Sequence, residues 1–243
     1  MNTTLNYSPN FNVKKRKMNQ IKFIIFHYTG MKKENQAISQ LTNLKSKVST
    51  HYLIKNSGEI LTLVPDLYIA WHAGISSWKK FKSINKYSIG IEISNPGHEN
   101  SYKKFSKKQI KSILKLSSYL IKKYKIKSNF ILGHSDIAPD RKKDPGENFP
   151  WKYLSKKNIG YWHELNDVKI LKKRNQKVSK LEKEKFLKNL YKIGYPKIIF
   201  SNQSKYFRLL TIAFQRRYRQ KLVNGLIDQE CYFISKNLLK KLK

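Results

Sequence analysis

The stretch GHSDIAPDRKKDPG, residues 133–146, places a histidine and a carboxylate ten positions apart and ends on a turn sequence. Together with His27, which closes an earlier apolar run, His134 and Asp144 could supply two nitrogens and one oxygen to a metal ion. Catalytic zinc typically takes three protein ligands and leaves one position for a water, whose pKa falls to about 7. The same residues could instead be two ordinary strand-end histidines and a turn-forming aspartate before Pro145. Spacing alone slightly favours that second interpretation, because the sequence has no HExxH motif.

Two further residues could act on a substrate beside such a metal. Glu92 lies in the apolar run IGIEI, where a carboxylate is costly unless it is paired or functional. It could be a general base or support a metal ligand, or it could form a buried ion pair with a lysine or arginine. Lys142 precedes Asp144 by two positions, so both side chains point to one side if the segment is extended. Lys142 could then stabilise an oxyanion, or it could be one more solvated lysine.

Two other histidines allow a functional and a structural interpretation. His51 alternates with apolar neighbours and could face the same cleft. His72 lies in a Trp-His-Ala-Gly loop that could line a sugar or peptide site. Either ring could instead be packed, with both nitrogens hydrogen-bonded. The residue types leave both interpretations open.

Three apolar runs are expected to position these side chains. Residues 21–30, 88–97 and 129–134 are short, rich in isoleucine or phenylalanine and closed by turn residues or by a polar candidate, which is typical of buried strands. In α/β sheets, ligands gather beyond the carboxyl ends of strands. The two histidines and the glutamate that end these runs are therefore predicted to meet in one region. Other expected elements are a helix over 35–46, a hairpin over 50–65 and a helix over 107–125 capped by Ser106.

The charge balance is strongly basic, with 51 Lys+Arg against 15 Asp+Glu and a formal net charge of +36. Such a field attracts polyanions. However, the basic residues are nearly all lysines spread along the chain, whereas a dedicated phosphate reader would concentrate arginines at a few sites. We interpret the charge as compositional drift that brings some non-specific affinity for polyanions. The apolar content of 40% is sufficient for a folded core.

The cysteine count and the N-terminus restrict the compartment. With Cys231 as the single cysteine, no internal disulfide and no cysteine-based zinc cluster can form. Cys231 is expected in the core of a helical module. The N-terminal stretch has no apolar run of the kind found in signal peptides, and no run reaches the length of a membrane span. The default expectation is the cytoplasm.

The composition changes towards the C-terminus. Residues 165–180 are polar and lysine-rich, and we interpret them as a linker. Residues 181–243 contain three stretches with helical spacing, separated by Gly-Tyr and Asn-Gly. The expected organisation is a catalytic domain over 1–164, a linker over 165–180 and a small all-α three-helix domain over 181–243.

Five motifs in order identify a family. The segments FIIFHYTGM, VSTHYLI, AWHAGISSW, NKYSIGIEISNPG and GHSDIAPDRKKDPG resemble those of the zinc N-acetylmuramoyl-L-alanine amidases. This is the amidase-2 group, related to peptidoglycan recognition proteins and including an AmpD-like branch. The resemblance covers roughly residues 7–164. It implies an α/β fold with a mixed β-sheet flanked by helices, one zinc ion per chain in a surface cleft, and hydrolysis of the amide between the lactyl group of N-acetylmuramic acid and L-alanine.

The resemblance also implies residue roles. It makes His27, His134 and Asp144 the zinc ligands, which overturns the structural interpretation of these three residues. Glu92 matches the acid/base glutamate of the AmpD-like branch, and Lys142 matches the lysine that stabilises the transition state. Arg141 would meet an anionic peptide group, and the Trp-His-Ala-Gly loop would line the groove. The expected substrate contacts are Arg141, Trp71, His72 and His51.

The last helices carry a second resemblance. The stretch AFQRRYRQKLVNGLIDQE is similar to the pattern of the three-helix peptidoglycan-binding module, which would hold glycan polymer near the active site. The expected partner is peptidoglycan or a muropeptide, with no specific nucleic acid and no transmembrane segment, and the chain is expected to be a monomer. Such a module suggests murein outside the cytoplasm, so the periplasm or cell wall is the alternative to a cytoplasmic location.

Two alternative functions compete with the amidase. The first is a non-catalytic peptidoglycan-binding protein of the same fold, but such a protein would lack a ligand, and this sequence keeps three ligands, Glu92 and Lys142. The second is a basic nucleic-acid-binding protein, which would show strongly salt-dependent affinity for DNA. The dispersed lysines and the absence of a recognisable nucleic-acid-binding motif argue against it.

Overall fold

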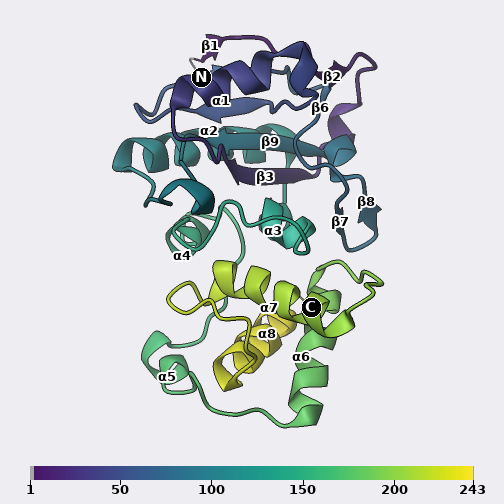
Figure 1. The fold of residues 1–243 in the computed structure, drawn as a ribbon, viewed down its shortest axis with the longest axis vertical. Coiled ribbons are helices and arrows are strands. Elements are labelled where there is room, and N and C mark those ends of the chain that lie inside the picture. The colour runs from purple at the N-terminus through teal and green to yellow at the C-terminus, as the bar shows by residue number, and fades with distance from the viewer. Residues whose placement is uncertain (1–2, 243) are drawn as a thin grey trace.

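The computed structural model describes residues 3–242. A six-stranded mixed sheet forms the centre of the N-terminal region (Figure 1). Its strands are β1 (Thr4–Leu5), β3 (Phe23–Tyr28), β4 (Tyr52–Ile54), β5 (Ile60–Thr62), β9 (Ser88–Ile93) and β10 (Ile131–Gly133). They lie in the order β1-β5-β4-β9-β3-β10, and β4 and β5 form the expected antiparallel hairpin while the other neighbours are parallel.

The central strand β9 alternates between two environments. Its three isoleucines belong to the core beneath helix α2 (Lys107–Tyr124). Because successive side chains of a strand point to opposite faces, Ser88, Gly90 and Glu92 lie on the other face. The predicted cap of α2 is confirmed, since Ser106 accepts a hydrogen bond from the Gln109 backbone in a capping box.

The register of the parallel strands brings the polar candidates together. His27 in β3 pairs directly with Glu92 in β9, so both side chains leave the same face of the sheet. Strand β10 pairs with β3 up to Phe26, and His134 follows immediately as the first residue of helix α3 (His134–Ile137). The predicted meeting of these candidates at the carboxyl ends of three strands is therefore confirmed.

Smaller elements surround the sheet. Besides short 3-10 helices, the N-terminal region contains two short ribbons and two further α-helices: β2 (Phe11–Asn12) with β6 (Ile69–Ala70), β7 (Ser77–Trp78) with β8 (Phe81–Lys82), α1 (Glu34–Thr42) and α4 (Trp151–Ser155). Within residues 3–242, no helix is both long and apolar enough to cross a bilayer.

The C-terminal helices, here called the tail, lie on the side of α3 and α4 away from the sheet (Figure 1). They are α5 (Asp167–Leu171), α6 (Lys180–Ile193), α7 (Gln203–Tyr218) and α8 (Gln229–Lys241), and the last three match the predicted helical stretches. The segment expected as a linker contains α5 and is bonded to α8, because Arg174 forms a two-pronged ion pair with Glu230 at 2.6 and 2.8 Å.

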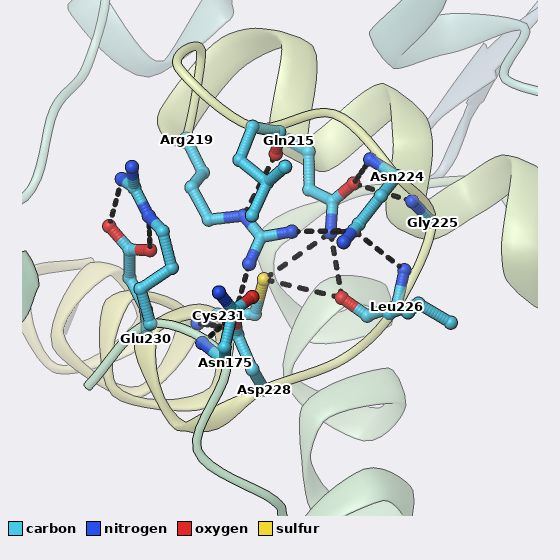
Figure 2. A network of polar contacts seen from close by, with 11 residues as sticks. Asn175, Gln215, Arg219, Asn224, Gly225, Leu226, Asp228, Glu230 and Cys231 are labelled. Carbon is cyan, nitrogen blue, oxygen red and sulfur yellow. Dashed lines mark hydrogen bonds and ion pairs between the residues drawn. The ribbon is translucent and has the colours of Figure 1, made fainter.

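A polar cluster called the tail network shapes the loop between α7 and α8 (Figure 2). Gln215 donates to the carbonyl of Leu226 at 2.8 Å and accepts from two backbone N–H groups of the loop. Arg219 donates to Asp228 and, at 2.8 Å, to Asn224. Gln215, Arg219, Asn224 and Asp228 make up the network. Cys231 lies fully buried beside it, as predicted.

The N-terminal region and the tail share a core and a buried ion pair. Phe23 and Ile25 of β3 belong to the same apolar cluster as the tail residues. Across this contact, Arg217 of α7 donates to Asp136 Oδ2 at 2.5 Å, and Tyr195 donates to Asp136 Oδ1 at 2.8 Å. The tail thus holds the helix that begins with His134.

Candidate active site

The three expected metal ligands, here called the metal triad, converge. The Nδ1 atoms of His27 and His134 are 3.0 Å apart, and Asp144 Oδ2 lies 2.9 and 3.1 Å from them. All three residues are buried. Ligand atoms around a tetrahedral zinc ion at about 2.0–2.2 Å lie roughly 3.3 Å apart. The triad therefore has a donor set and a spacing that could bind a metal ion.

Outer hydrogen bonds orient the triad. His134 Nε2 lies 3.2 Å from the carbonyl oxygen of Ala73, and His27 Nε2 lies 3.0 Å from His72 Nδ1. The backbone N–H of Ser135 donates to the carbonyl of Asp144 at 2.9 Å and holds the two segments together. Because both outer Nε2 atoms are engaged, each ring presents Nδ1 to the shared point.

The protonation states of His27 and Asp144 favour the binding of a metal ion. Burial, with a smaller contribution from His134, lowers the pKa of His27 to about 4 and keeps this ring neutral at pH 7. Burial alone would raise the pKa of Asp144, but the neighbouring His134 and His27 outweigh it and hold that pKa well below its usual range. An unprotonated imidazole and a carboxylate are the forms that coordinate metals.

Glu92 lies in the same cleft with an unusual carboxyl group. Its Oε2 atom is buried and has no hydrogen-bond partner within residues 3–242. Burial, followed by repulsion from Asp144, raises the pKa of Glu92 well above its usual value, and Lys142 partly opposes this shift. A half-buried carboxyl group with one buried, unpartnered oxygen next to a ligand cluster is a candidate for proton transfer.

The cleft around the triad has a volume of about 450 Å³, which is in the usual range for small-ligand sites. A larger hollow of about 690 Å³ lies in the tail, but the clustered titratable groups line the smaller cleft. The sequence did not single out several residues of the cleft wall. They include Tyr28, Met31, Gln40, Ser49, Glu99 and Lys143.

Two of the expected substrate contacts line the cleft with polar atoms already in use. Trp71 donates from Nε1 to Asn12 at 2.6 Å. Arg141 is exposed at the mouth, and its Nη2 donates to the carbonyl of Ala73 at 2.7 Å and to that of Ile75. The remaining guanidinium donors of Arg141 are still available to a ligand.

The two histidines predicted as substrate contacts are placed differently. His51 is fully buried and does not line the cleft. Its Nδ1 accepts from the Gly90 backbone at 3.0 Å, and its Nε2 faces the carbonyl of Tyr68 at 3.1 Å. This placement speaks against direct substrate contact by His51, because the ring lies inside the fold. His72 lines the cleft, but both ring nitrogens already have partners within the protein.

Comparison with known proteins identifies the family. The profile of the N-acetylmuramoyl-L-alanine amidases (Amidase_2) matches residues 17–147. AmiD of Escherichia coli is 34% identical over 238 residues, covering 91% of this chain and 83% of that protein. AmpD of Citrobacter freundii is 38% identical over 105 residues, covering 43% of this chain and 54% of that protein.

Solved structures show the same fold. Escherichia coli AmiD, in complex with the substrate anhydro-N-acetylmuramic acid-L-Ala-D-γ-Glu-L-Lys, has a TM-score of 0.83 at 31% identity and covers 95% of this chain and 91% of its own. AmpDH3 of Pseudomonas aeruginosa, in complex with anhydromuramic pentapeptide, has a TM-score of 0.80 at 27% identity and covers 95% of this chain and 94% of its own. Since the profile matches more than half of the chain and the likeness to AmiD extends through most of it, this chain belongs to the N-acetylmuramoyl-L-alanine amidase family.

Proposed function

We propose that this chain is a zinc-dependent amidase that hydrolyses the bond between the lactyl group of N-acetylmuramic acid and L-alanine, in peptidoglycan or in muropeptides. The observation that carries the proposal is the convergence of His27, His134 and Asp144 beside the unpaired carboxyl group of Glu92. The anhydromuramyl peptides bound by AmiD and AmpDH3 support this class of substrate.

The donor set fits one zinc ion. Two imidazole nitrogens and one carboxylate oxygen match the ligand preference of zinc, whereas magnesium and calcium favour sites built from oxygen alone. A zinc ion held by the metal triad would polarise the scissile carbonyl and lower the pKa of the attacking water.

Two residues of the chain would transfer the proton of the attacking water and stabilise the negative charge that forms on the carbonyl oxygen. With zinc bound, its positive charge would favour the ionised form of Glu92. The Glu92 carboxylate then takes the proton of the attacking water and returns it to the amine nitrogen of L-alanine as the carbon–nitrogen bond breaks. Lys142 lines the same cleft, and its ammonium group donates to the oxyanion that forms on the carbonyl carbon. The products are the lactyl carboxylic acid and a free peptide amine.

The first test combines metal content with product release. The wild-type protein is expected to bind about one zinc per chain and to release L-alanyl peptide from an anhydromuramyl peptide or from polymeric peptidoglycan. Asp144→Ala should abolish both, and Asp140→Ala in the same loop should abolish neither. Folded wild-type protein without zinc or cleavage would contradict the amidase and leave a non-catalytic peptidoglycan-binding protein.

We propose further that the tail binds the glycan polymer. The hollow in the tail is lined by Lys177, Lys183 and Arg208 beside Phe207, which suits a polar chain that carries carboxylates. The double variant Lys183→Ala/Arg208→Ala is expected to sediment less with insoluble peptidoglycan than the wild type, with unchanged turnover of a soluble muropeptide. Unchanged sedimentation would exclude this surface as the polymer site.

A further inference from the structure

The loop that contains His72 is anchored next to the metal triad. The side chain of Asn85 accepts hydrogen bonds from the backbone N–H groups of His72 and Ala73, at 3.2 and 2.8 Å. The carbonyl of Ala73 faces Nε2 of His134, and the ring of His72 faces Nε2 of His27. Two consecutive loop residues are therefore the hydrogen-bond partners of the outer Nε2 atoms of both histidine ligands.

Strand β9 leaves room for the ring of His72. A Cβ atom added at Gly90 would lie 2.5 Å from Cγ of His72, a distance that real Cβ atoms do not adopt. The close approach of the ring to the strand thus requires glycine at this position. Ser88, two residues earlier on the same face, lies with its hydroxyl 3.0 Å from His72 Nε2.

The carbonyl of Ile84 ends this chain of hydrogen bonds and can only accept, so it fixes the direction of the other bonds. The Ser88 hydroxyl donates to the carbonyl of Ile84 at 2.8 Å, so its oxygen is left to accept from Nε2–H of His72. His27 Nδ1 is directed at the shared point of the metal triad, where a coordinating nitrogen carries no proton, so the ring proton of His27 is on Nε2. Because His72 carries its proton on Nε2, its Nδ1 accepts from Nε2–H of His27, 3.0 Å away.

We infer that His72 and Ser88 are positioning residues, whose hydrogen-bond chain fixes His27 as the Nε2–H tautomer with Nδ1 directed at the metal. This inference rests on the zinc site proposed above. It replaces the expectation that His72 binds substrate, because neither of its ring nitrogens is left for a ligand. Outer partners of metal-bound histidines raise ligand basicity, and their loss typically costs about 10–100-fold in metal affinity.

The tautomers can be measured directly. In protein labelled with ¹⁵N-histidine, long-range ¹H–¹⁵N spectra distinguish which ring nitrogen carries the proton, and single-histidine variants assign the signals. His72 is expected to be protonated at Nε2 with or without zinc, because Ser88 and Ile84 set its direction independently of the metal. His27 is expected to be the same tautomer in the zinc-loaded protein. A proton on Nδ1 of His72 would overturn the inference, whereas failure of the wild type to bind zinc would count against the proposed function instead.

Variants test the consequence for the metal, with zinc affinity measured by competition with a chromophoric chelator. His72→Leu should weaken binding about 10–100-fold, and His72→Asn should recover part of the loss, because its amide oxygen can accept near the position of Nδ1. Wild-type affinity in His72→Leu would overturn the positioning role.

Ser88 has a matched control in the chain. Ser117 is also fully buried, and its hydroxyl has no partner among the described residues. Ser88→Ala should weaken zinc binding by less than His72→Leu does, and Ser117→Ala should leave it unchanged. Thermal unfolding of the metal-free variants separates a loss of ligand geometry from a general loss of stability. Equal zinc affinities of the two serine variants would exclude Ser88 from the chain.

Discussion

The cleft around the metal triad and the tail network differ in the hydrogen bonding of their polar groups. In the cleft, Glu92 has an unpartnered oxygen and a strongly raised pKa. In the tail network, the charge of Arg219 meets Asp228, whose other oxygen accepts from the backbone of Cys231 at 3.0 Å (Figure 2). Gln215 is also satisfied, through both its amide nitrogen and its oxygen.

This difference distinguishes polar groups that stabilise the fold from polar groups that remain available for a reaction. A buried polar group without a partner destabilises the folded state, so it persists where another requirement retains it. A network in which the donors and acceptors are already paired fixes one conformation and leaves none of them to bind a substrate. We therefore expect changes in the cleft to alter turnover and changes in the tail network to alter stability, and the following variants are ordered by their expected effect on turnover.

Glu92→Gln should give the largest loss of turnover while making the metal-free protein more stable at neutral pH. Losing a general acid/base should lower kcat/KM on a muropeptide by about 10²–10⁴-fold. The folded metal-free protein keeps the Glu92 proton above pH about 4.3, where the unfolded chain releases it. The folded state then binds more protons than the unfolded state, so stability falls as pH rises, and glutamine removes this dependence.

Calorimetry of chelator-treated protein at pH 5 and pH 8 measures the second effect. The gain of Glu92→Gln over wild type should be larger at pH 8, with a rise in Tm of about 2–4 °C for each kcal/mol in a chain of this size. Exposed Glu99, which pairs with Lys143, provides the control variant Glu99→Gln. A lower Tm for Glu92→Gln at pH 8 would show that the cleft carboxylate stabilises the fold.

Lys142→Met should cause the second-largest loss of turnover. Removing a donor to the oxyanion is expected to lower kcat by about 10²–10³-fold with little change in Tm. The neighbouring Lys143 is exposed and pairs with Glu99 across the mouth of the cleft, so Lys143→Met should change kcat less than about threefold, as is usual for exposed ion pairs. Equal losses in the two variants would indicate a general effect of positive charge.

Arg217→Met tests a buried ion pair that lies close to the cleft. It leaves the buried carboxylate of Asp136 without its cation, which should cost about 3–5 kcal/mol of stability. Because Asp136 shares a short helix with His134, zinc affinity should also fall, by a few-fold. Chemical denaturation and chelator competition measure the two effects. Recovery of stability in Arg217→Met/Asp136→Asn would assign the loss to the unpaired charge.

Arg219→Met should have the smallest effect on turnover. It leaves Asp228 unpaired and should cost a similar 3–5 kcal/mol of stability, yet kcat and zinc affinity should stay at wild-type values under conditions where the protein is folded. Exposed Arg208 gives the matched variant Arg208→Met, whose stability should change by less than about 0.5 kcal/mol. Reduced zinc affinity in Arg219→Met would mean that the tail network is coupled to the cleft.

The sequence allowed the convergence of His27, Glu92 and His134 to be predicted, because the ends of neighbouring parallel strands meet at one edge whatever their separation along the chain. The helices of the tail were also predictable, since their apolar spacing and punctuation are local signals. Assigning roles to the residues required the ordered motifs of the family.

Contacts between distant segments could not be predicted. His51 is enclosed because the side chain of Arg16 reaches to within 3.0 Å of its ring, 35 positions along the chain. The role of His72 depends on its position above Gly90, which follows from tertiary packing and not from periodicity. The pair of Asp136 and Arg217 joins residues 81 positions apart, and nothing near either residue indicates its partner.

That last pair has a consequence for biosynthesis. The chain emerges from the ribosome N-terminus first, so every residue of the metal triad is translated long before Arg217. Until α7 has emerged, the carboxylate of Asp136 lacks its guanidinium partner, and the apolar face around Phe23 and Ile25 is not covered by the tail. The nascent chain therefore carries a complete set of ligands on an incomplete core. Docking of α7 is the step that would complete the support of His134, so the ligands are translated before the contact that holds one of them can form.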